Sequence, residues 1–179
     1  MAPSLLPGVQ VWLRLVGYSL AAFCCTVLHI VFLPLVAVAG IVPDLLLLLV
    51  FWIALREGQI AGTLAGFAIG VLMDLVLPGA LGLSAFAKTL AGFVVGFFAP
   101  VGNDDLRMMS IGKLLSVVAL GSGVHNVVYF ALFVHPMDVN PVEFVLKYAG
   151  ASTGYTLVVA TLLVLGLQLW WRRRVISER

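Results

Sequence analysis

Long apolar segments, each close to the length of a membrane-spanning helix, are separated by short polar breaks along this sequence of 179 residues. Hydrophobic residues make up 63% of the chain and charged residues only 10%, and the mean hydropathy is +1.17. Soluble domains carry about 25% charged residues, so this chain has too few polar side chains to cover a water-soluble core. The apolar runs are continuous rather than alternating, which indicates helices. We therefore expect an all-α integral membrane protein.

A spanning helix needs about 20 apolar residues, and prolines, glycines and charged residues divide the chain into six segments of roughly this kind. The expected spans are residues 12–33, 42–55, 58–77, 81–99, 114–134 and 145–171. The second segment is short, so we expect it to be tilted or to begin nearer Gly40. The sequence predicts a single domain, residues 1–179, that folds as a six-helix bundle.

The basic residues predict the orientation, because cytoplasmic loops carry an excess of Lys and Arg. Six spans place both termini on one side of the membrane. Eight of the ten basic residues then lie on that side: Arg14, Arg56, Arg107, Lys113, Arg172, Arg173, Arg174 and Arg179. Only Lys88 and Lys147 lie on the other. We expect both termini in the cytoplasm, with Arg172 to Arg174 as a cytoplasmic anchor that contacts membrane lipid.

Glycines recur at every fourth position of the third segment, and a carboxylate takes the next position of the series, Asp74. The row consists of Gly58, Gly62, Gly66 and Gly70, and Gly92 and Gly96 form a matching pair on the fourth segment. Small residues let helices in a bilayer approach closely and gain dispersion contacts. Two interpretations stay open: tight packing between the third and fourth segments, or a groove that receives a helix of another protein.

Two charges, Asp74 and Lys88, fall inside the apolar segments at similar depths from the outer side. An unpaired charge near mid-bilayer costs about 3 kcal/mol on insertion scales. We expect an intramembrane Asp74–Lys88 ion pair. The alternative is that Asp74 accepts hydrogen bonds from loop amides while Lys88 extends outward to the interface. Ion or proton transport is disfavoured because no relay of acids accompanies Asp74.

Polar side chains also collect on one face of the fifth segment and in the outer half of the sixth. They are Ser122, His125, Asn126 and Tyr129 on the fifth segment, and Ser152, Tyr155 and Thr156 on the sixth. The spacing i, i+3, i+4, i+7 puts the first set on one face of a helix, and the two sets can face each other as an outer polar patch. The patch is either interhelical hydrogen bonding or a small-ligand pocket.

No catalytic, nucleotide-binding or nucleic-acid-binding motif appears in the sequence. His29 and His125 lie on different segments without ligand spacing, so we expect no metal site. Cys24 and Cys25 are adjacent on one helix and point in different directions, so no disulfide is implied. We expect no cofactor and no enzymatic activity.

The central stretch resembles the MreD family of rod shape-determining membrane proteins. The resemblance rests on Pro43-Asp44 at the start of an apolar segment, the series Gly62, Gly66-Phe67, Gly70, Asp74, and the following Leu81-Gly82. Six short-looped spans in fewer than 200 residues complete it. It implies a non-enzymatic scaffold of the bacterial cell-elongation machinery in the inner membrane, one that binds MreC and acts with RodA, a class B penicillin-binding transpeptidase and, indirectly, MreB in peptidoglycan synthesis and cell shape.

The MreD family is also similar to the six-helix substrate-binding subunits of energy-coupling-factor transporters, which supplies an alternative function: a vitamin-type binding subunit that uses the outer polar patch as its pocket. Those subunits dock through small residues spaced A-x-x-x-A on the first helix. Here the first segment pairs Ala21 with Cys25 and Ala22 with Thr26. The pairs Ala61/Ala65 and Ala87/Ala91 lie on the third and fourth segments. This departure favours the scaffold.

Overall fold

The computed structural model describes residues 7–37, 41–77, 81–100, 109–134 and 140–177. These ranges contain six α-helices and one short 3-10 helix: α1 (Pro7–Val31), η1 (Leu33–Val36), α2 (Leu45–Glu57), α3 (Gln59–Val76), α4 (Leu83–Gly96), α5 (Ile111–Val134) and α6 (Pro141–Ser177). Helices α1, α3, α5 and α6 are long and apolar enough to cross a membrane. The expected all-α membrane class is confirmed. That α2 and α4, of 13 and 14 residues, also cross the bilayer stays a prediction.

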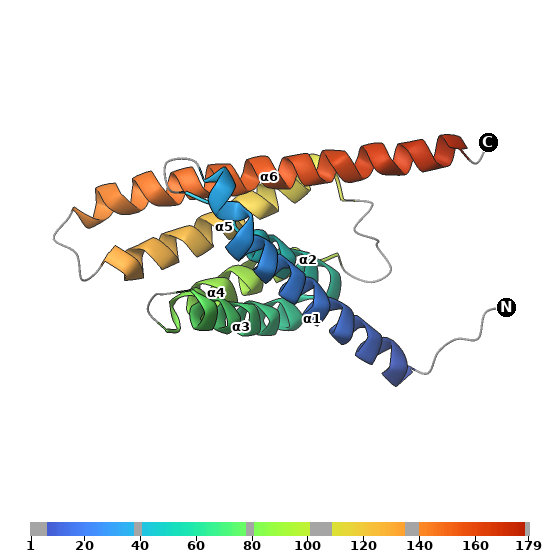
Figure 1. The fold of residues 1–179 in the computed structure, drawn as a ribbon, viewed down its shortest axis with the longest axis horizontal. Helices are drawn as coiled ribbons and strands as arrows, with labels where there is room; N and C mark the ends of the chain where they lie inside the picture. Colours follow the sequence, from blue (N-terminus) through green and yellow to red (C-terminus); the bar gives the residue numbers. More distant parts are fainter. Residues whose placement is uncertain (1–6, 38–40, 78–80, 101–108, 135–139, 178–179) are drawn as a thin grey trace.

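Helix α2 lies at the centre of the bundle and packs against α1, α3, α4 and α5. Its side chains Leu46, Leu47, Val50 and Ala54 are completely buried. Helices α5 and α6 run side by side, and α1 crosses over the bundle (Figure 1). The start of α1 and the end of α6 point to the same end of the molecule, as an even number of passes requires (Figure 1).

The beginning and end of α2 follow from local chemistry. Asp44 caps its N-terminus, where Oδ1 accepts a hydrogen bond of 2.8 Å from the Leu47 N–H, so the helix begins later than residue 42. Gly58 ends it with φ +94°, a backbone conformation that side chains other than glycine rarely adopt. A Cβ at Gly58 would meet nothing within 4 Å. Gly58 is therefore a turn residue, and its assignment to the packing row is wrong.

The other glycines of the row pack α3 tightly against α4. A Cβ on Gly66 would overlap the carbonyl of Lys88, one on Gly70 would overlap the backbone of Ala85, and Gly62 and Gly92 would clash with each other's backbones. A Cβ on Gly96 would overlap the backbone of Gln59. These glycines form an internal packing surface, so the alternative of a partner groove at these positions is wrong.

Candidate functional site

A buried ion pair joins the start of α2 to α4. The Lys88 side chain is only 1% exposed, and its Nζ contacts Oδ2 of Asp44. His125 of α5 completes the cluster, with Nε2 at 3.6 Å from the same carboxylate oxygen. One carboxylate thus serves the α2 N-terminus, α4 and α5 together. A buried charge left without its partner costs several kcal/mol, so this cluster fixes the position of α2.

The prediction of an Asp74–Lys88 pair is wrong, because each of the two side chains has another partner. Asp74 accepts hydrogen bonds from the N–H groups of Gly82 (2.9 Å), Ser84 (3.0 Å) and Ala85 (3.1 Å), and so caps the start of α4. Gly82 turns the chain into α4 with φ +92°. The capping alternative therefore describes Asp74 correctly. Lys88, however, stays inside and pairs with Asp44, a residue that was not considered as its partner.

The outer polar patch is buried and joins helices. Asn126 of α5 donates 2.9 Å to Oγ1 of Thr153, and Ser152 donates 3.2 Å to Oδ1 of Asn126. Tyr155 donates 2.6 Å to the carbonyl oxygen of Val36 in η1. Thr153, next to Ser152 on α6, is a further member of this network that the spacing of the polar residues did not indicate.

Burial decides between the two interpretations of this patch. Ser122 and Thr156 are 0% exposed, and His125 and Asn126 are 4% exposed. Thr156 accepts a hydrogen bond of 3.4 Å from the Asp44 N–H, which connects the patch to the ion pair. The aromatic ring of Tyr129 stacks on Phe133, with centroids 6.0 Å apart. Burial and the bonds of Asn126, Ser152 and Thr156 favour interhelical hydrogen bonding, although Ser122 Oγ and His125 Nδ1 are buried without a hydrogen-bond partner and Tyr129 and Tyr155 are half-buried.

Within the described ranges, no three His, Cys, Asp or Glu side chains gather as a possible metal site. The buried cluster has a structural role. The Asp44 carboxylate neutralises the Lys88 ammonium group, and His125 and the Thr156 hydroxyl lie beside that carboxylate residue. The side chains of Arg172, Arg173 and Arg174 lie outside the described part of the chain, so the cytoplasmic anchor stays a prediction.

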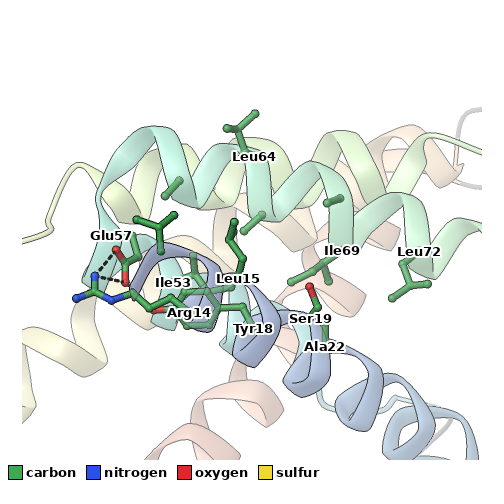
Figure 2. A pocket seen from close by; sticks show the side chains of 14 residues that line it. Arg14, Leu15, Tyr18, Ser19, Ala22, Ile53, Glu57, Leu64, Ile69 and Leu72 are labelled. Carbon is green, nitrogen blue, oxygen red and sulfur yellow. Dashed lines mark hydrogen bonds and ion pairs between the residues drawn. The ribbon is translucent and has the colours of Figure 1, made fainter. Parts of the chain in front are cut away.

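A groove of about 670 Å³ runs between α1 and α3, with Ile53 and Glu57 of α2 also in its lining (Figure 2). Its lining is mostly apolar: Val11, Leu15, Ala22, Ile53, Ala61, Leu64, Ala65, Ala68, Ile69 and Leu72, with Ser19. Polar groups mark one end, where Arg14 Nη1 donates to both Glu57 carboxylate oxygens, at 3.2 and 3.1 Å, and Tyr18 donates 2.7 Å to Glu57 Oε1. These bonds attach α1 to the end of α2 (Figure 2).

The other face of α1 is exposed along its length. Trp12, Val16, Leu20, Phe23 and Val27 are each more than 40% exposed, and we call this set the α1 stripe. At 100° per residue it points about 130° away from the α1 residues that line the groove. Only 6% of the spanning part of α1 is buried, against 39% for α5. Helix α1 therefore has the smallest share of buried residues among the four helices of spanning length.

A family model described as rod shape-determining protein MreD matches residues 10–174, from the first turn of α1 to the last turn of α6. No curated protein and no solved structure matches the chain.

Proposed function

Because the chain belongs to the MreD family of rod shape-determining membrane proteins, we propose that it is a non-enzymatic scaffold of the bacterial cell-elongation machinery. It binds the single transmembrane span of MreC. Through MreC it helps to organise peptidoglycan synthesis by RodA and a class B penicillin-binding transpeptidase, with MreB connected indirectly. It resides in the inner membrane with both termini in the cytoplasm.

The exposed α1 stripe is the observation that carries this proposal. Lipid tails are as apolar as leucine, so a helix gains little from leaving lipid unless packing is better against protein. Large side chains such as Trp12 and Phe23, 70% and 65% exposed, provide dispersion contacts for a partner span. The MreC span therefore packs along the α1 stripe.

A scaffold needs a rigid docking surface, and two sets of contacts anchor α1 to the bundle. Glu57 binds Arg14 and Tyr18 at one end of the helix. Ala22 and Thr26 are buried further along it. Behind α1, the Asp44–Lys88 pair and the α3–α4 glycine contacts make a core that resists deformation.

The alternative function, a vitamin-binding transport subunit, receives little support from the polar patch, because Asn126 and Ser152 are buried and hydrogen-bonded between α5 and α6. The groove lies elsewhere, on α1, α2 and α3, and its lining is largely apolar.

Site-directed crosslinking tests the scaffold and the docking face together. In a protein with Cys24 and Cys25 replaced by alanine, we introduce Val16→Cys or Phe23→Cys and scan single cysteines along the MreC span in native membranes. We expect disulfide crosslinks from the α1 stripe. Ile60→Cys on α3 is the matched control, since Ile60 is 79% exposed but lies off α1. Crosslinks confined to Ile60→Cys would place the docking face on α3 instead of α1. Failure of MreC to co-purify at all would contradict the scaffold.

A further inference from the structure

We propose that the groove between α1 and α3 binds an anionic phospholipid of the inner leaflet, with one acyl chain in the groove and the phosphate on Arg14 and Arg56. This site lies on the face of α1 opposite the α1 stripe and does not depend on MreC. It does rest on the orientation in which the end of α2 at Glu57 faces the cytoplasm.

The length of the groove suits one leaflet. Along α1 it extends from Val11 to Ala22, and along α3 from Ala61 to Leu72. Eleven residues of helix rise about 17 Å. Half of a hydrocarbon core of about 30 Å is about 15 Å. An acyl chain that starts at the polar end therefore reaches the far end of the groove, at Ala22 and Leu72, near mid-bilayer.

The lining of the groove suits a flexible acyl chain. Apart from Ser19 and the polar end it is apolar, and the α3 side carries the small side chains of Ala61, Ala65 and Ala68. A hydrocarbon chain can follow such an uneven apolar surface while its anionic headgroup meets Arg14 at the polar end.

Arg14 and Glu57 line the polar end of the groove, and Arg56, which precedes Glu57 on α2 and lies outside the lining, brings a second positive charge to this end of the helix. The Arg14 side chain is 54% exposed, and both of its bonds to Glu57 use Nη1, which leaves other N–H donors of the guanidinium for a phosphate. Arg56 lies in the last turn of α2 with its guanidinium 5.8 Å from the centroid of the Trp52 ring. Trp52 is 47% exposed, and tryptophan prefers the headgroup region.

Native mass spectrometry of the purified full-length protein tests this site. The delipidated protein is titrated with dioleoyl-phosphatidylglycerol or dioleoyl-phosphatidylcholine in mild detergent. We expect one retained phosphatidylglycerol and no comparable retention of phosphatidylcholine. Arg56→Gln leaves the Arg14–Glu57 pair intact and should weaken phosphatidylglycerol binding about fivefold, the effect of one basic residue near a membrane surface. Lys113→Gln is the matched control for lost charge and should change nothing.

A second pair of variants tests the groove itself. Ala65→Phe fills it and should abolish retention while both arginines remain. Ile60→Phe puts the same aromatic side chain on α3 outside the groove and should leave binding unchanged. Size-exclusion profiles verify that each variant is folded. Equal retention of both lipids, or retention unaffected by Ala65→Phe, would overturn the proposal. So would a crosslink between Ala65→Cys and the span of a partner protein, which would identify a helix as the occupant.

Discussion

Two aspartates at the starts of two helices have different tasks in this protein. Both carboxylate oxygens of Asp74 accept hydrogen bonds from amides at the α4 N-terminus. Asp44 caps α2 with one oxygen and uses the other to neutralise Lys88. The position of Lys88 in an apolar segment indicated that its charge needs a partner. The sequence did not indicate whether that partner is Asp44 or Asp74, because the answer depends on how the residues before α2 bring Asp44 toward α4.

The Asp44–Lys88 pair predicts a compensating double substitution. Lys88→Met or Asp44→Asn alone leaves one buried charge and should destabilise the protein by about 3–5 kcal/mol. Asparagine can still cap α2, so the double variant Asp44→Asn/Lys88→Met should recover most of the lost stability. Thermal unfolding of the purified protein in detergent measures this. Asp74→Asn combined with Lys88→Met is the control and should give no rescue. Additive losses in the first double variant would mean that the two charges are not coupled.

At the scale of helices, continuous hydrophobicity was enough to predict that all six exist, but not where they begin. Helix α6 begins at Pro141, because Asn140 Oδ1 accepts hydrogen bonds from the N–H groups of Val142 (3.2 Å) and Glu143 (3.5 Å). Asn followed by Pro is a recognisable helix start, yet the polar residues nearby moved the expected start to residue 145. The four-residue glycine period predicted a close helix contact, and the backbone geometry decided between the two partners left open, α4 and a helix of another protein, in favour of α4.

Two glycine-to-alanine substitutions should have opposite effects. A methyl group at Gly66 would overlap the Lys88 carbonyl on α4, whereas one at Gly154 in α6 would meet nothing within 4 Å. Gly66→Ala should therefore destabilise the protein by about 1–3 kcal/mol through forced separation of α3 and α4. Gly154→Ala should leave it unchanged or stabilise it by up to about 1 kcal/mol, because alanine favours helix. Thermal unfolding in detergent compares the two. Equal transition temperatures would show that α3 and α4 can move apart without cost.

At the scale of the whole molecule, a tightly packed centre supports one loosely covered helix. The centre comprises α2 to α5, joined by buried leucines, glycine contacts and the ion pair. Helix α1 lies over it, with the groove on one face and the α1 stripe on the other. One interpretation of the sequence placed the partner surface on the glycines, which instead pack inside the bundle. The exposure of α1 could not be predicted from the sequence, because an apolar helix has the same composition whether lipid or protein covers it.

The orientation of this arrangement determines which leaflet and which end of a partner α1 meets, and it follows from the distribution of eight basic residues against two. In the background without Cys24 and Cys25, we expect Leu81→Cys, in the turn before α4, to react with a membrane-impermeant maleimide in intact spheroplasts. Leu81 is 76% exposed. Arg179→Cys should react only after the membrane is permeabilised, and a cysteine-free protein controls for background labelling. The reverse pattern would put Arg14, Arg56 and Glu57 at the outer face, and the proposed phospholipid would then have to come from the outer leaflet.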